Sequence, residues 1–142
     1  MNWVLSIITF VGGGLLGFLL PHVQKPLTDY RKTLTDISKT LLNNGHVMYA
    51  PRDNGQPASN EEMNLRYDLR AFHAQLLSSA NSIPRFARPI LEALGLLQSR
   101  AQIEEGARML IGISNQLVTA NKDLPHLIKL NEKLAAALDI AV

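Results

Sequence analysis

The chain has 142 residues, of which 14 are Lys or Arg, 12 are Asp or Glu and none is cysteine. The lack of cysteine excludes disulfides, thiolate metal sites and cysteine nucleophiles. A net charge of +2 is too small to indicate nucleic-acid binding, which usually needs a clustered basic surface. This length accommodates one anchor and one small domain, because domains typically contain about 100–150 residues.

An uncharged, strongly apolar stretch opens the chain. Residues 3–20 read WVLSIITFVGGGLLGFLL, and no charged side chain precedes Lys25. A helix of that length covers about 27 Å, close to the roughly 30 Å hydrocarbon core of a bilayer. We therefore predict one transmembrane helix in an anchor region at residues 1–21. A buried core helix is the alternative, but a core helix this long usually carries a charged face.

A cleaved signal peptide is the second alternative for this stretch. Such peptides have a positive n-region and a small-residue cleavage site, whereas only two uncharged residues precede Trp3 and residues 18–22 read FLLPH. We expect the anchor to be retained. Lys25, Arg31 and Lys32 follow it, so the positive-inside rule predicts a single-pass protein of the inner (cytoplasmic) membrane, with its N-terminus outside and its C-terminal domain in the cytoplasm.

Small residues recur at every fourth position of the predicted anchor, at Thr9, Gly13 and Gly17. These residues share one helix face, and small residues at this spacing let two helices approach closely. The pattern predicts a homo-oligomer or a partner membrane protein packed on that face. A glycine-rich helix without a partner is the alternative.

Residues 22–42 are predicted to form an amphipathic juxtamembrane helix. Pro21 and Pro26 are expected to bend or restart the helix where it leaves the membrane. Its apolar positions step by three and four residues, as a helix requires, at Leu27, Tyr30, Leu34, Ile37 and Leu41. Residues 43–60 are rich in Asn, Gly and Pro, which predicts a long loop that is either mobile or functional.

Residues 61–142 are predicted to complete the helical domain. Asn60 is expected to cap the next helix, with Glu61 and Glu62 complementing its dipole. The side chains expected to point inward on that helix are Met63, Tyr67, Phe72, Leu76 and Ala80. Residues 82–98 are unusual, because Pro84 and Pro89 are expected to break them although residues 90–97 are strongly apolar.

Two further helices follow. Ser99 and Gln102 form a capping-box pattern that begins a helix continuing to about Ala120. Its expected inward residues are Ile103, Ala107, Leu110, Ser114 and Leu117. Asp123 is expected to cap the last helix, with Pro125 in its first turn and Leu127, Leu134 and Leu138 on its buried side. No stretch alternates as a strand does. The predicted fold class is all-α, a single N-terminal transmembrane helix followed by a four- to five-helix antiparallel bundle.

The sequence offers no pattern typical of an active site, so we do not expect an enzyme or a cofactor. His22, His46, His73 and His126 lie far apart, and no pair has the i,i+4 spacing of metal ligands. The acidic pairs at residues 61–62 and 104–105 lie in first turns, where carboxylates complement the helix dipole. No nucleophile-elbow motif is present.

Three groups of polar side chains are candidates for surface or binding roles. Glu62, Arg66 and Arg70 share one face and are expected to form a solvated row of ion pairs. Four arginines are candidates for an anion pocket that takes a small phosphate-bearing ligand, with lipid-headgroup attraction or a solvated surface as the alternative; they are Arg85, Arg88, Arg100 and Arg108. Ser114, Asn115 and Gln116 indicate either tight helix packing or a polar contact to another subunit or ligand.

Three segments carry a resemblance that spans most of the predicted soluble part; they read DYRKTLTDISKTLL, LRAFHAQLLSSANSIP and LGLLQSRAQIEEGARMLIGISNQL. They are similar to a broad family of small bacterial proteins with one N-terminal transmembrane helix and a cytoplasmic helical domain. The resemblance implies that topology. It implies no activity, cofactor or site residue.

The sequence as a whole favours a non-enzymatic, membrane-anchored module for helical interaction and oligomerisation. Its expected partners are the lipid bilayer and a second copy or another membrane protein. A ligand- or partner-gated effector that perturbs the membrane, for example in antiphage defence, is one alternative. An accessory subunit of a larger membrane complex is the other.

Overall fold

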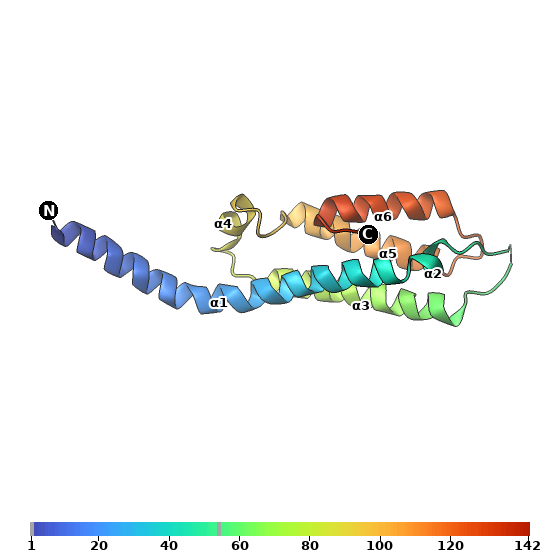
Figure 1. Ribbon diagram of the computed structural model, residues 1–142, viewed down its shortest axis with the longest axis horizontal. Helices are drawn as coiled ribbons and strands as arrows, with labels where there is room; N and C mark the ends of the chain where they lie inside the picture. Colours follow the sequence, from blue (N-terminus) through green and yellow to red (C-terminus); the bar gives the residue numbers. More distant parts are fainter. Residues whose placement is uncertain (1, 54) are drawn as a thin grey trace.

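The computed structural model describes the backbone of residues 2–53 and 55–142, and the side chains of residues 21–53 and 55–142. Within these residues the fold consists of six α-helices without a strand, which confirms the predicted all-α class. Four long helices form an up-and-down bundle: α1 (Asn2–Asn43), α3 (Asn60–Ser82), α5 (Arg100–Gln116) and α6 (Leu124–Leu138) (Figure 1). The short helices α2 (Gly45–Tyr49) and α4 (Arg88–Ala93) lie near opposite ends of it.

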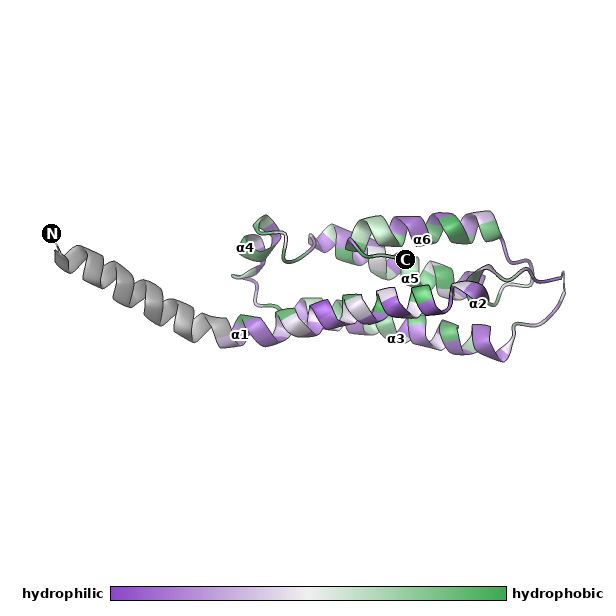
Figure 2. Ribbon diagram, viewed as in Figure 1, coloured by the Kyte–Doolittle hydropathy of each residue, from purple (hydrophilic) through white to green (hydrophobic). Residues whose placement is uncertain are grey.

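One hydrophobic core joins the four long helices. α3 packs between α1 and α5, and α6 packs against α5. Each long helix contributes fully buried apolar side chains, among them Ile37, Leu69, Leu110 and Leu134. Figure 2 shows hydrophilic and hydrophobic residues alternating along the described part of each helix, as expected where one helix face is buried and the other is solvated.

The last two helices confirm their predicted caps and inward faces. Ser99 and Gln102 form the capping box of α5, and the side chain of Asp123 accepts a hydrogen bond from the backbone N–H of His126 in α6. All the residues expected to point inward on these two helices are buried. α5 ends at Gln116, a turn before the expected end near Ala120.

α1 runs through Pro21 and Pro26 as one helix, so of the two predicted outcomes, a bend or a restart, the restart does not occur. A proline removes one backbone donor and crowds the preceding turn, which can bend a helix without ending it. Tyr30, Ile37 and Leu41 are buried as predicted, and Leu27 and Leu34 are partly buried beside them.

The predicted transmembrane segment at residues 3–20, with its Thr9/Gly13/Gly17 face, lies outside the residues whose side chains are described. Across residues 21–53 and 55–142, none of the helices combines the length and the apolar run that a bilayer crossing needs.

The start of α3 differs from the prediction in three ways. The stretch predicted as a loop at residues 43–60 contains the short helix α2. The residue that caps α3 is Ser59 and not Asn60, because Ser59 and Glu62 form a reciprocal capping box. On the inner face of α3, Leu76 and Ala80 are buried as predicted and Phe72 is partly buried. Leu65 and Leu69 are also buried, whereas Tyr67 is 60% exposed and Met63 is only partly buried.

The segment at residues 82–98 forms a turn and a short helix. Pro84 follows the end of α3 at Ser82, as expected for a residue that stops a helix. Pro89 does not break the segment, because it lies in the first turn of α4, where its missing N–H has no intrahelical partner to lose. Gly95, with a φ of 65°, turns the chain away from the end of α4.

Candidate functional site

A buried cluster of three charged side chains closes the end of the bundle opposite α4. Glu62 Oε2 lies 2.6 Å from Arg52 Nη2, and Glu62 Oε1 lies 3.0 Å from Lys122 Nζ. The side chains are only 8%, 6% and 1% exposed for Glu62, Arg52 and Lys122. A buried ion pair lowers the free energy of the fold only if further hydrogen bonds satisfy its remaining polar groups.

The two cations of this cluster also bind backbone carbonyls. Lys122 Nζ donates to the carbonyl oxygens of Val47 (2.9 Å) and Ala50 (3.2 Å). Arg52 donates from Nη2 to Leu117 (2.5 Å) and from Nη1 to Thr119 (3.1 Å). The cluster therefore joins three segments distant in sequence, namely α2 with the loop after it, the start of α3, and the α5–α6 connection.

These contacts determine the charge state of Glu62. Burial raises the pKa of its carboxyl, but hydrogen bonds from Arg52, from the backbone N–H of Ser59 and from Lys122 outweigh burial and hold the pKa at about 2. Glu62 is therefore ionised at neutral pH. A carboxylate with such a low pKa is a poor general base, so the arrangement is suited to fixing the loops rather than to transferring protons.

Sequence reasoning missed this cluster because its members are 10 and 60 residues apart. One local signal could have found part of it. Ser59 and Glu62 have the capping-box spacing that was recognised at Ser99 and Gln102. The expected solvated row of Glu62, Arg66 and Arg70 is wrong, since the Glu62 carboxylate turns to Arg52 and Lys122.

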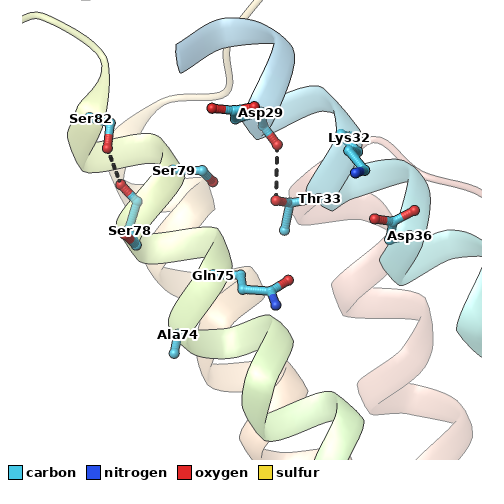
Figure 3. Close-up of a pocket in the computed structure, with 9 residues that line it drawn as sticks. All are labelled: Asp29, Lys32, Thr33, Asp36, Ala74, Gln75, Ser78, Ser79 and Ser82. Carbon is cyan, nitrogen blue, oxygen red and sulfur yellow. Dashed lines mark hydrogen bonds between the residues drawn. The ribbon is translucent and has the colours of Figure 1, made fainter. Parts of the chain in front are cut away.

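A polar groove lies between α1 and α3, with a volume of about 600 Å³. Figure 3 shows side chains from both helices facing this gap, with Gln75 of α3 extending toward Thr33 of α1. Hydroxyl groups in the groove are engaged locally: Thr33 Oγ1 donates to the carbonyl of Asp29 (3.0 Å) and Ser82 Oγ to that of Ser78 (2.9 Å). The groove thus presents hydroxyl, amide and carboxylate groups and the ammonium of Lys32 on an open surface.

The four candidate anion-binding arginines are not used as one group. Arg100 Nε donates to Glu104 Oε1 at 2.8 Å, and Arg108 Nε donates to the carbonyl of Glu104. Arg88 donates to the carbonyls of Ala80 and Ile83 at the end of α3. One cavity has both Arg88 and Arg100 among its described lining residues, together with Glu104. Arg85 is exposed on the turn before α4.

The polar group at the end of α5 divides between core and surface. Ser114 is fully buried and donates to the carbonyl of Ile111 at 2.9 Å, as expected for close helix packing. Asn115 is exposed, and its Oδ1 accepts a hydrogen bond from Arg70 Nη2 at 3.0 Å. Gln116 Oε1 is buried and finds no hydrogen-bond partner within the described residues.

The histidines and acidic residues of the described part of the chain form no group of three that could hold a metal ion. His73 Nδ1 lies 3.0 Å from the carbonyl oxygen of Ala107, which ties α3 to α5. No protein-family model matches this chain, and neither the curated proteins nor the solved structures yield a significant match. The resemblance to a family of single-span bacterial proteins therefore stays a prediction.

Proposed function

We propose that the chain is a membrane-tethered helical module that associates with further copies of itself through its anchor helix. The observation that carries the proposal is the continuity of α1. One helix extends from Asn2 to Asn43, and its first half includes the uncharged stretch at residues 3–20. An uncharged apolar stretch of this length is long enough to cross a hydrocarbon core.

The second half of α1 is an integral part of the bundle. Tyr30 and Ile37 are fully buried, and Leu41 is nearly so. A flexible linker between anchor and domain would leave the bundle free to rotate. A continuous helix instead couples the two, because the direction of the anchor sets the direction of the first helix of the bundle. Pairing of two anchors would therefore bring two bundles together in a restricted geometry.

The ligand-gated alternative has no comparable support. Its basis in the sequence is the group of four arginines together with the glycine-rich stretch at residues 3–20, which lies outside the residues whose side chains are described. Arg100 is paired with Glu104, and Arg88 binds the carbonyls at the end of α3. Arg88 is thus engaged by the backbone, and Arg100 has an exposed partner on its own helix. The absence of enzymatic activity and the cytoplasmic location of the bundle stay predictions.

The lack of native cysteine allows a direct test of the proposed anchor contact. Gly13→Cys places a single thiol on the Thr9/Gly13/Gly17 face. Leu15→Cys is the matched control, since a residue two positions further on points to nearly the opposite side of a helix. Both full-length variants would be expressed, their membranes treated with a mild oxidant, and the products separated without reductant.

We expect a disulfide-linked dimer for Gly13→Cys and little for Leu15→Cys. Gly17→Cys places a single thiol on the same face. Adding Gly13→Leu to that protein should separate the helices and abolish its cross-linking. Equal cross-linking at residues 13 and 15 would contradict a specific face. Monomer alone for every variant would contradict self-association.

A further inference from the structure

The segment around α4 carries two parallel apolar stripes, and only one of them is buried. Ile83, Ala87 and Leu91 recur every four residues and are at most 7% exposed. Phe86, Ile90 and Leu94 have the same spacing, with Phe86 and Ile90 one residue before Ala87 and Leu91, and they are 55%, 62% and 65% exposed. Ile90 lies in α4, and Phe86 and Leu94 lie in the turns that flank this helix. We call this second stripe the α4 apolar face.

The α4 apolar face concentrates exposed apolar area in one place. The other large apolar side chains that the described residues expose are spread over four other helices, at Leu42, Tyr49, Tyr67 and Ile128. Single exposed apolar residues of that kind are normal on a protein surface. Three bulky ones on one face of a short segment are typical of a surface that contacts another apolar phase.

The position of the segment in the bundle is the second observation. In Figure 1 α4 stands at the end of the bundle where α1 enters it, beyond the ends of α5 and α6. A hydrogen bond of 2.6 Å from Tyr30 to Gln98 joins α1 to the connection between α4 and α5. The first turns of α1 with described side chains contain Val23 and Leu27, which pack against the same core as Leu91. This is the end of the bundle from which α1 leads back to the uncharged stretch.

Exposed cations flank the α4 apolar face at this end of the bundle, where Asp29 of α1 is also exposed. Arg85 is exposed beside Phe86, and Lys25 is exposed on α1. Glu92, the acidic residue of α4, is two positions from Ile90, so it points to nearly the opposite side of the helix. A short helix with bulky apolar side chains on one face and flanking cations lies in the interfacial plane of a bilayer, with the apolar face about 5–10 Å into the boundary of the headgroups and acyl chains.

We infer that the α4 apolar face rests in the headgroup layer of the same membrane that holds the anchor. This inference rests on the proposed membrane tether. With the anchor as one attachment and α4 as a second, the bundle is held in a fixed orientation over the lipid surface instead of pivoting about α1. Arg88, which binds the carbonyls of Ala80 and Ile83, holds the α4 segment against the end of α3.

The test uses full-length protein with one introduced thiol carrying an environment-sensitive dye. Ile90→Cys reports on the α4 apolar face, and Glu92→Cys is the control on the other side of the same helix. Asn60→Cys, at the opposite end of the bundle, is the distant control. Each protein is reconstituted in vesicles of phosphatidylcholine and phosphatidylglycerol, with and without lipids that carry a quencher at a known depth in the acyl chain.

The inference predicts blue-shifted emission and several-fold stronger lipid quenching at residue 90 than at residues 92 and 60. Adding Phe86→Asp and Leu94→Asp to the Ile90→Cys protein should remove the quenching. Equal, weak quenching at all three positions would overturn the inference. A blue shift at residue 90 without lipid quenching would also overturn it, because a protein surface and not lipid would then cover the face.

Flotation of the same vesicles after an alkaline wash separates this inference from the proposed function. Protein that stays with the vesicles while residue 90 is unquenched retains the tether and loses the α4 contact. Protein that washes off contradicts the tether, and the quenching measured before the wash still decides whether α4 meets lipid.

Discussion

The hydroxyl of Tyr30 donates a 2.6 Å hydrogen bond to Oε1 of Gln98, and Gln98 Nε2 in turn donates to the carbonyl of Leu138 at 3.0 Å. Two side-chain bonds thus join α1, the α4–α5 connection and the end of α6. Tyr30 is fully buried, and burial raises the pKa of its phenol well above the usual range. The phenol is therefore a neutral donor at any ordinary pH.

Tyr30→Phe should lower the free energy of unfolding by about 1 kcal/mol, the typical net value of one hydrogen bond. The phenyl ring keeps the packing, but Gln98 loses its donor. Urea unfolding of the full chain in detergent micelles, followed by circular dichroism, measures the change. Tyr67→Phe is the control, since Tyr67 is 60% exposed. Equal effects of the two substitutions would show that the Tyr30 hydroxyl does not stabilise the fold.

Glu62→Gln should destabilise the fold by roughly 3–5 kcal/mol, because Arg52 and Lys122 would be left buried without their counter-charge. Glu61→Gln changes the exposed neighbouring carboxylate and should have an effect within about 0.5 kcal/mol. The same urea titration compares the two proteins. A loss for Glu62→Gln no larger than that for Glu61→Gln would mean that the cluster does not hold the loops.

The stability of the wild-type chain should fall with acidification in a defined window. The folded pKa of Glu62, about 2, lies below its usual value of 4.5, so its contribution is present above pH 4.5 and is lost as the pH falls toward 2. Glu62→Gln should remove this part of the acid dependence. Midpoints of urea unfolding measured across that window test the prediction, and an identical slope in both proteins would refute it.

Two glycines of α5 should respond differently to alanine. A Cβ at Gly106 would lie 2.5 Å from Leu138 Cδ2, whereas one at Gly112 would meet Leu130 Cδ1 at 3.3 Å. Leu138 is fully buried and cannot yield without moving α6, while Leu130 is only partly buried. Gly106→Ala should destabilise by about 1–3 kcal/mol, as overpacking does. Gly112→Ala should be neutral or slightly stabilising, because alanine gains about 1 kcal/mol of helix propensity. Thermal melts of both variants measure these changes, and equal melting temperatures would contradict the prediction.

The sequence was sufficient where a single apolar stripe and a local cap agree. On α5 the capping box at Ser99 and the spacing from Ile103 to Leu117 determine both the start and the buried face, and both were predicted correctly. α3 has apolar residues on two faces. Leu65 and Leu69 were not told apart from Met63 and Tyr67, because the packing of α3 between α1 and α5 decides which face is buried.

The ion cluster marks the other limit of sequence reasoning. The sequence predicts that Glu62 complements the dipole of α3, and its place in the first turn of that helix agrees with the prediction. Its pairing with Arg52 and Lys122 depends on how two loops meet at one end of the bundle. The α4 apolar face could not be predicted either. The sequence shows an apolar run at residues 90–97, but the fold determines that Ile90 and Leu94 stay exposed while Leu91 is buried.

The membrane tether is the central claim, and alkaline extraction with intact-mass measurement tests it most directly. Membranes from cells that express the full chain would be washed with sodium carbonate, and the protein analysed by mass spectrometry. We expect the chain in the pellet at its full 15.7 kDa, with residues 3–20 retained. Recovery of the full-length chain in the supernatant, or of a chain that lacks its first twenty residues, would contradict the account.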